Sequence, residues 1–485
     1  MRLTTANHAP IHPAGDYVLY WMHSARRPGY NFALQQAAAM ACQLQVGLVV
    51  FEPLVCDEPY ASLRFHHFVL QGMRDNQQAF ATMPILYYPW LETKAGEWND
   101  LLSRLAHKAC LVITDRFPTT PVDSRVKTVA NSLPVQLQTV DSNGLLPLQL
   151  VERDYPTAYA FRRFLQKVLP AFLNQHPLAD PLQGLTLPQP KLPAELLRRY
   201  PIADPHALLR PGALDALPID HRIKPVGVEG GAKAAGERLL DFLCDDLAGY
   251  DLQRNQPDSD RTSRLAPYLH FGHLSVHEIF SRLAEAEGWH AGRLALETSG
   301  RRSGWWGMSS TAEAFLDELV TWRELAYAFC ARTPDYSSYE SLPTWAQHSL
   351  NHHADDLRPV LYSPAQFEEA ATHDPLWNAA QRQLREDGRI HGYLRMLWGK
   401  KILEWSLTPQ LALNTMLDLN DRYALDGRNP NSYSGIGWCL GRFDRAWGPE
   451  REIFGKIRYM SSENTARKVS VKKYLQRYSG QKSLF

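Results

Sequence analysis

The N-terminal part of the chain alternates short apolar runs with stretches of helical periodicity. The apolar runs predict buried strands, and the stretches between them place apolar residues at helical spacing. Strands are expected at 17–21, 45–51, 84–88 and 109–115, and helices at 31–44, 60–80 and 98–108. This alternation predicts a parallel sheet covered by helices on both faces. Neither glycine-rich motif for dinucleotides or ATP occurs here, so we do not expect such a site.

A proline-rich stretch follows this region. Residues 171–220 hold nine of the 33 prolines, which break any long regular element. We therefore expect an extended linker here. From about residue 230 onward the periodicity is helical, with clear examples at 236–250, 311–333 and 391–405. The Gly/Arg/Ser-rich stretch 286–310 is expected to be a loop.

The expected fold class is therefore α/β plus all-α. It comprises a Rossmann-like parallel-sheet domain at 1–170, an interdomain linker at 171–230 and an all-helical domain at 231–485. The 485 residues are 45% hydrophobic and 21% charged, an ordinary globular composition. The six cysteines show no CxxC spacing, which argues against a zinc site or a disulfide framework and favours a reducing compartment. With no apolar signal segment and no apolar run long enough to span a bilayer, we expect a cytoplasmic protein. The sequence does not determine the oligomeric state, and a monomer is the default expectation.

The formal net charge of +1 indicates no particular partner, but the charge is unevenly distributed. Residues 441–485 contain eleven Lys/Arg and four Asp/Glu, a net charge of +7. Within them, 441–460 interleaves aromatic with basic side chains, a mixture that suits a nucleic-acid surface. A packed loop followed by a solvated helix would produce the same pattern, so this stretch alone leaves both interpretations open.

Three other segments contain residues suited to a ligand site. In 391–405, Trp398 and Trp405 share one helix face about 10 Å apart, although a core stripe has the same spacing. In 261–275, hydroxyl side chains precede a helical pattern, where backbone N–H groups hold a phosphate or are simply capped. In 420–438, polar side chains among turn formers either surround a ligand or stabilise the loop by Asx turns.

The joint order of these segments resembles the class II cyclobutane pyrimidine dimer photolyases. The matching motifs are TSRLAPYLHFGHLS, FLDELVTWREL, DPLWNAAQ, HGYLRMLWGKKILEW, LNDRYALDGRNPN and REIFGKIRYM, and the match covers about 236–477. WGKKILEW and FGKIRYM are specific to that class, and 20–34 resembles its first strand and helix more loosely. The resemblance implies that light excites reduced FAD in the helical domain. The cofactor then gives an electron to a dimer in UV-damaged DNA, the ring splits and the electron returns.

The resemblance also implies roles for individual residues. For FAD these are Tyr250, Thr262, Ser263, Arg264, Leu265, Arg395, Asp426 and Asn420, the last facing flavin N5. For flavin reduction they are Trp377, Trp398 and Trp405, in an order that the sequence leaves open. For the dimer they are Glu318, Trp322, Met396 and Trp438, together with Asn420. For DNA they are Arg254, Asp444, Arg445, Trp447 and Arg451. A deazaflavin-type antenna in the α/β domain is a further expectation, with no residue set to identify it.

Two departures from the family pattern fall near the DNA side. The family shows two glycines, one residue and His-Asp, whereas this chain has Gly441-Arg442-Phe443-Asp444, one residue shorter and without the histidine. The family's DGRDPNG is DGRNPNS here. We therefore expect altered DNA docking and intact photochemistry. Two alternatives are a cryptochrome-like blue-light photoreceptor without repair activity and a flavoprotein that binds DNA without catalysis.

Overall fold

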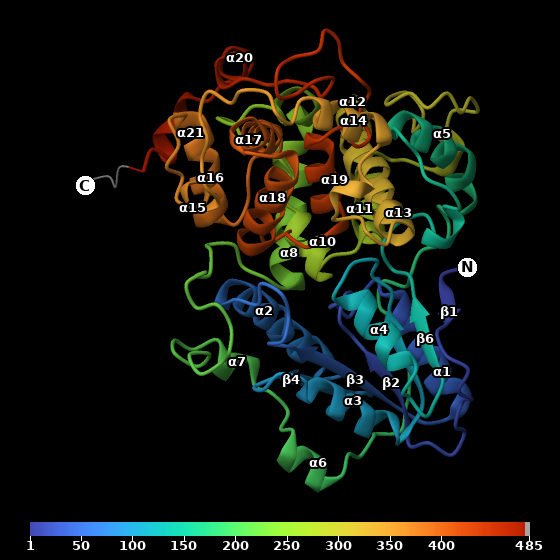
Figure 1. Cartoon of the computed structure of the whole chain (residues 1–485). Coiled ribbons are helices and arrows are strands. Elements are labelled where there is room, and N and C mark those ends of the chain that lie inside the picture. The colour runs from blue at the N-terminus through green and yellow to red at the C-terminus, as the bar shows by residue number, and fades with distance from the viewer. Residues whose placement is uncertain (481–485) are drawn as a thin grey trace. The chain divides into compact units, whose positions relative to one another are not determined.

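The structure is a computed structural model that describes residues 1–480, and the chain divides into two compact units (Figure 1). The first unit comprises 1–152, 168–241 and 264–292, and the second comprises 153–167, 242–263 and 293–485. No helix within residues 1–480 is both long and apolar enough to cross a membrane. The two units are described separately below.

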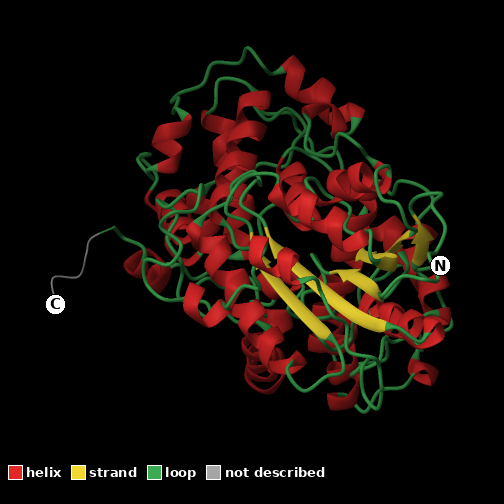
Figure 2. Cartoon of the chain, turned by 90° about the horizontal axis from the view of Figure 1, so that it is seen from below, coloured by secondary structure: helices red, strands yellow, loops and turns green. Residues whose placement is uncertain are grey.

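The first unit contains a six-stranded sheet with strand order β1-β6-β5-β2-β3-β4, drawn in yellow in Figure 2. The strands are β1 Leu3–Thr5, β2 Tyr17–Trp21, β3 Gly47–Leu54, β4 Leu86–Leu91, β5 Ala109–Asp115 and β6 Leu137–Val140. Every pairing is parallel except that of β1 with β6. The expected parallel sheet is confirmed, and β1 and β6 are additional strands that the apolar pattern did not predict.

Helices cover both faces of this sheet because successive residues of a strand point to opposite sides. Tyr17 and Leu19 of β2 pack with α3 (Glu97–Ala106) and α4 (Val122–Ala130), whereas Val18 and Tyr20 pack with α1 (Phe32–Leu44). Helix α2 (Leu63–Phe80) forms a further core with residues of the proline-rich stretch. These helices correspond to the expected ones, except α4, which the pattern missed.

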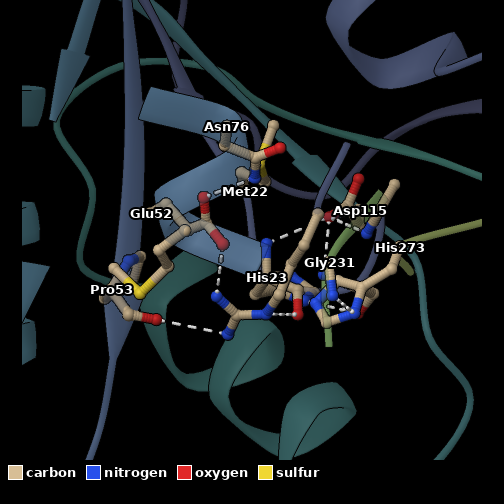
Figure 3. Close-up of polar contacts among 12 residues, drawn as sticks. Met22, His23, Glu52, Pro53, Asn76, Asp115, Gly231 and His273 are labelled. Carbon is tan, nitrogen blue, oxygen red and sulfur yellow. Dashed lines mark hydrogen bonds and ion pairs between the residues drawn. The ribbon is translucent and has the colours of Figure 1, made fainter. Parts of the chain in front are cut away.

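The strand order reverses between β2 and β5, and the loop that follows β2 is fixed at this point. The Asp115 carboxylate at the end of β5 accepts from the backbone N–H groups of His23, Ser24 and Ala25 at 3.0, 2.8 and 2.9 Å (Figure 3). In nucleotide-binding α/β domains, ligands bind at such a switch point. An internal carboxylate therefore holds the N–H groups at the position where those domains bind their ligand.

The buried Glu52 organises a second polar cluster in this unit (Figure 3). Its carboxylate accepts from the Arg26 guanidinium at 3.0 Å, from the Asn76 amide at 2.9 Å and from the Tyr87 hydroxyl at 2.6 Å. Arg26 also donates to the Pro53 carbonyl at 3.2 Å. The buried charge is thus paired and hydrogen-bonded, as stability requires.

The proline-rich stretch 171–220 is extended, as expected, but it packs on the first unit along its length. Leu182 and Leu187 join one face of the core, Tyr200 joins the other, and Leu217 packs near α2. Its regular elements are the short helices α6 Ala194–Arg199 and α7 Pro205–Leu208. The stretch therefore covers the sheet instead of acting as a free spacer.

The remaining helices of the first unit are α8 Ala232–Asp241, α10 Ala266–Phe271 and α11 Val276–Ala286. The second unit is helical and contains α5 Ala158–Val168, α9 Tyr250–Gln253, α12 Ser310–Leu316, α13 Arg323–Arg332, α14 Thr344–His352, α15 Pro364–Glu368, α16 Pro375–Asp387, α17 Gly392–Trp405, α18 Pro409–Tyr423, α19 Pro430–Cys439, α20 Ser462–Lys468 and α21 Lys472–Arg477. Short 3-10 turns lie at Leu148–Leu150, Leu169–Ala171, Leu247–Gly249, Ala291–Arg293 and Tyr339–Ser341. The expected loop at 286–310 contains one such turn.

Besides α8, which groups with the first unit, two segments lie outside their expected domains. Helix α5 groups with the second unit, because its Arg162 forms a buried ion pair with Asp317. Segment 264–292 groups with the first unit, because Phe271 and His273 pack on Phe68 of α2. Both regroupings follow from pairings between distant segments, which local periodicity does not reveal.

Candidate functional site

Two indole rings and a thioether come together in the second unit. The rings of Trp322 and Trp438 lie 5.4 Å apart between centroids at 34°, and the Met396 sulfur lies 4.0 Å from the Cys439 sulfur. Trp322, Met396 and Trp438 are only partly buried, unlike the core residues around them. They form a wall of accessible aromatic and sulfur surface. These three residues and Glu318, which the family resemblance assigns to the dimer, are called the dimer pocket below.

The close approach of α17 to α19 depends on a glycine. A Cβ on Gly399 would lie 2.4 Å from the Cys439 sulfur and 3.0 Å from the Met416 sulfur. Only glycine therefore allows α17, which contains Met396, to pack at this distance from α19, which contains Trp438.

Glu318 lies in a recess of the second unit. Its side chain is 45% exposed, yet the surrounding protein raises the pKa of its carboxyl, and the nearby Arg254 opposes this shift. An Arg254 guanidinium nitrogen lies 3.8 Å from the carboxylate, and another donates to the Ala314 carbonyl at 3.2 Å. Arg254 and Glu318, expected on the DNA side and at the dimer, are thus neighbours.

The helix that carries Glu318 and Trp322 is interrupted by a π-helical segment. The expected helix at 311–333 consists of α12, a π segment over Asp317–Trp322 and α13. A second π segment, Phe242–Asp246, precedes Tyr250. Isolated π turns occur mostly at functional sites, because the wider turn displaces side chains from the regular helical positions. Both π segments here lie beside expected site residues.

Arg395 and Asp426 form a polar pair one residue along α17 from Met396. An Arg395 guanidinium nitrogen lies 3.4 Å from one Asp426 oxygen. Arg395 Nε and the second oxygen, Asp426 Oδ1, are buried without a hydrogen-bond partner. A free donor beside a free acceptor matches the alternating carbonyl and N–H groups of an isoalloxazine edge. The residues present therefore fit a flavin ring.

Asn420 lies on α18, and a hydrogen bond to the neighbouring Asp421 fixes the orientation of its side-chain amide. The Asn420 amide nitrogen donates to the Asp421 carboxylate at 3.1 Å, which leaves the amide oxygen as the group directed elsewhere. Asp421 also accepts from the Arg428 backbone N–H at 2.8 Å and from the Tyr433 hydroxyl at 3.3 Å. Burial raises the pKa of Asp421, and these donors oppose the shift. An oriented amide oxygen is the group that could accept a hydrogen bond from a reduced flavin.

The residues expected at the cofactor phosphates are divided between the two units. Tyr250 is buried in the second unit against Phe242 and Phe315, with centroids 5.6 and 5.7 Å away. Thr262 donates to the Asp260 carboxylate at 3.1 Å in the same unit, which also contains Ser263. Arg264 and Leu265 belong to the first unit.

The expected helix start near Thr262 and Ser263 lies further along the chain. Helix α10 begins at Ala266, with Leu265 as its N-cap and Pro267 in the first turn. The proline suits this position, because the first turn of a helix has no intrahelical partner for the N–H group that proline lacks. The hydroxyl side chains therefore precede the helix by several residues instead of capping it.

The three tryptophans expected in electron transfer form a row of contacts in the second unit, in which Trp377 reaches Trp398 through the Trp398 backbone carbonyl. Trp377 lies in the middle: its indole donates to the Trp398 carbonyl at 3.0 Å, and its ring is 6.1 Å from that of Trp405. All three are at most 3% exposed. The Asp374 carboxylate caps α16 by accepting from the Trp377 N–H at 3.0 Å, which fixes the middle indole. The contact order is thus 398, 377, 405.

Two side chains at the outer end of this row were not identified from the sequence. Tyr362 and His373 lie 5.6 and 5.0 Å from the Trp405 ring, and their phenol and imidazole are hydrogen-bonded at 2.7 Å. His373 is exposed, so the pair connects the buried indoles with solvent. Both residues lie in irregular segments, where no periodicity marks them.

The loop expected at the DNA is compact. The Asp444 carboxylate accepts from the Arg445 N–H at 2.8 Å and from the Trp447 indole at 3.2 Å. The guanidinium groups of Arg445 and Arg458 lie over the Trp447 ring at 4.6 and 5.1 Å. The structure therefore brings together three of the expected DNA residues and adds Arg458.

A basic groove adjoins this loop. Its lining includes Trp447, Arg451, Arg458, Tyr459 and Lys468, and no carboxylate lines it among the residues that the structure describes. Positive side chains beside aromatic rings suit the phosphates and bases of a nucleic acid. Arg254, the fifth expected DNA residue, lies at the Glu318 recess instead.

Within residues 1–480, no group of three or more His, Cys, Asp or Glu side chains is arranged to hold a metal ion.

Comparison with known proteins gives a consistent result, although no family model matches the chain. Three curated relatives are named deoxyribodipyrimidine photo-lyase. The protein from Methanothermobacter thermautotrophicus is 34% identical over 467 residues, covering 96% of this chain and 95% of its own. The protein from Potorous tridactylus is 33% identical over 470 residues, covering 95% and 81%. The protein from Oryza sativa subsp. japonica is 34% identical over 486 residues, covering 96% and 88%.

A solved structure is similar over the same extent. The bacterial class III photolyase from Agrobacterium tumefaciens has a TM-score of 0.70 and 16% sequence identity, and the match covers 96% of this chain and 86% of that chain. At this level of identity the likeness supports the fold alone.

Proposed function

We propose, from the premise that the chain belongs to the deoxyribodipyrimidine photo-lyase family, that it splits cyclobutane pyrimidine dimers in UV-damaged DNA by light-driven electron transfer. The family follows from relatives above 30% identity over nearly the whole chain, and it makes the protein a carbon–carbon lyase of DNA repair. The electron-transfer mechanism, the class II type and the individual roles are what the proposal adds.

One observation carries the proposal. On α17, Arg395 belongs to the polar pair that fits a flavin edge, and the next residue, Met396, belongs to the accessible wall of the dimer pocket. A cofactor ring and a substrate ring would therefore lie on either side of a single turn of helix. Electron transfer requires a short distance between the cofactor ring and the substrate ring.

The chain's own residues bind and orient the reactants in this proposal. When bound, reduced FAD supplies the light-excited electron. Arg395 and Asp426 bind the ring edge, and the Asn420 oxygen accepts from N5–H, with Asp421 fixing that amide. Tyr250, Thr262, Ser263, Arg264 and Leu265 are proposed to bind the remainder of the cofactor.

The dimer must leave the duplex to reach this pocket. We assign Trp322 and Trp438 to packing on its pyrimidine rings, with Met396 beside them. The Glu318 carboxyl, whose pKa is raised by the surrounding protein, is suited to hydrogen bonding with the pyrimidine carbonyl and N–H groups. Together these side chains exclude water from the rings while bonds break.

Two further groups of residues are assigned to electron supply and to DNA binding. The row is proposed to conduct electrons from solvent through Trp405 and Trp377 to Trp398 and then to the flavin, following the contacts between these residues. Asp444, Arg445, Trp447 and Arg451, with Arg254, are proposed to bind the DNA, through phosphate neutralisation and insertion into the gap left by the dimer. The deazaflavin-type antenna and the monomeric, cytoplasmic state remain predictions.

A repair assay tests the proposal directly. The purified protein is reduced, mixed with UV-irradiated oligothymidine and illuminated with near-UV or blue light, and recovery of thymine absorbance is followed. We expect recovery with the native chain, a strong reduction with Glu318→Gln and native behaviour with Glu340→Gln, an exposed carboxylate of the same unit.

The other outcomes distinguish the alternatives. Normal flavin photoreduction without thymine recovery would favour a cryptochrome-like photoreceptor, and DNA binding without recovery would favour a non-catalytic flavoprotein. A protein that takes up no flavin would contradict all three functions.

A further inference from the structure

Lys400 is a buried cation directly behind the dimer pocket. It follows Met396 by one turn on α17 and is 1% exposed. Its ammonium nitrogen donates to the Cys439 carbonyl at 2.6 Å, one residue after Trp438. The charge therefore lies against both helices that supply the pocket wall.

No carboxylate of the described residues lies within ion-pair distance of this ammonium group. The adjacent Lys401 forms an ion pair with Glu404 at 2.7 Å, whereas Lys400 forms no ion pair within residues 1–480. Desolvation lowers the pKa of Lys400 to about 8, opposed by Cys439 and Asp444 and reinforced by Arg458. An unpaired buried cation destabilises the fold, and an apolar side chain of similar volume would avoid that cost. Buried ionisable groups with strongly shifted pKa values are frequent at functional sites.

We infer that the Lys400 ammonium stabilises the negative charge that repair places transiently on the dimer. This inference rests on the proposed function. In that reaction one electron enters the dimer, the two bonds joining the pyrimidines break, and the electron leaves, so the electron count at the end is unchanged. Lys400 keeps its protons throughout. Because the dimer is negative only between these events, a fixed cation favours splitting over premature return of the electron.

Charge variants of Lys400 test the inference. Pre-reduced enzyme is given saturating irradiated oligothymidine, and dimers split per absorbed photon are measured. We expect Lys400→Met and Lys400→Gln to lower this yield by about threefold or more, as loss of a nearby unit charge implies. Lys400→Arg should retain most of the yield. Lys401→Gln, which removes the neighbouring lysine, should match the native enzyme.

Two readouts separate an electrostatic role from a structural one. Flavin absorbance and affinity for dimer-containing DNA should be unchanged in Lys400→Gln, because only the charge is removed. The native yield should also fall as pH rises from about 7 to about 9, when Lys400 loses its proton, and this fall should be absent in Lys400→Met. Burial raises the pKa of the facing Cys439 thiol to about 11, above this range. Asp444 and Arg458 are the other charges acting on Lys400.

Several results would overturn the inference. Full native yield in Lys400→Gln would show that the charge of Lys400 is not needed for splitting. The hydrogen bond to the Cys439 carbonyl, which glutamine can still donate, would then be the only remaining role for this side chain. A native yield that stays constant over the same pH range would exclude a charge effect, even if no variant folds. Failure of the native enzyme to repair at all would instead refute the proposed function, so the two failures are distinguishable.

Discussion

Replacement of Trp398 by phenylalanine separates flavin reduction from repair. Trp398 is 1% exposed, and its indole donates to the buried Gln381 side-chain oxygen at 2.9 Å. Phenylalanine leaves that oxygen without its donor, which costs about 1–3 kcal/mol. The smaller ring adds about 1–2 kcal/mol through lost packing. We therefore expect Trp398→Phe to lower the free energy of unfolding by about 2–5 kcal/mol, as judged from these two contributions.

The functional effect should be much larger on photoreduction than on repair. Phenylalanine is far harder to oxidise than indole, so the row would be interrupted between the flavin side and Trp377. Oxidised protein is illuminated with an external reductant to measure photoreduction, and chemically reduced protein is used to measure repair. Trp306→Phe is the matched control, because Trp306 is also buried in the second unit but lies outside the row.

Two results would refute this reasoning. A native photoreduction rate in Trp398→Phe would show that electrons reach the flavin by another route. Loss of repair in chemically reduced Trp398→Phe, with flavin still bound, would mean that the residue acts in the repair step itself. In either case the assignment of Trp398 to the conducting row would be wrong.

Three further changes have predictable effects. Arg162→Met should cost about 3–5 kcal/mol in urea unfolding, since it leaves the buried Asp317 carboxylate with only the longer 4.0 Å ion pair to Arg302, and adding Asp317→Leu should recover much of this loss. Asp421→Asn should weaken flavin retention, measured by dialysis, because it removes the anion that orients the Asn420 amide. Lys400→Met should stabilise the protein by about 2 kcal/mol at pH 7: the lowered pKa represents a cost of about 3 kcal/mol, and the lost hydrogen bond offsets about 1. This gain should shrink as pH rises above about 8, where the native lysine becomes neutral, and a gain independent of pH would contradict the argument.

Much of the fold was predictable because its periodicities are strong. The four strands β2, β3, β4 and β5 and the helix over 311–333 follow directly from apolar spacing. The pattern missed β1 and β6, because short strands at or near a sheet edge contain few apolar positions. It also missed the regrouping of α5, since the Arg162–Asp317 ion pair joins segments far apart in the sequence.

The candidate site was predictable only where whole motifs repeat the family's order. The motif match supplied Trp377 as the third indole, but not its middle position, which depends on the packing of α16 against α17. Tyr362, His373 and Lys400 were missed for different reasons. The first two lie in irregular segments, and a lysine in a helix ordinarily predicts a solvated face, so its burial appears only in three dimensions.

The shortened loop before Asp444 has a structural explanation that bears on DNA docking. Gly441 has a positive φ of 106°, and a Cβ there would lie 2.9 Å from both Ala346 and Ile457. Phe443, which stands where the family has histidine, also has a positive φ of 60° and is buried against Phe329. The missing residue is thus accommodated by two left-handed positions and an apolar anchor, and Asp444 still bonds to the Trp447 indole. An anchor inside the protein cannot contact DNA, so any weakening of docking should come from the absent imidazole and not from displacement of the loop.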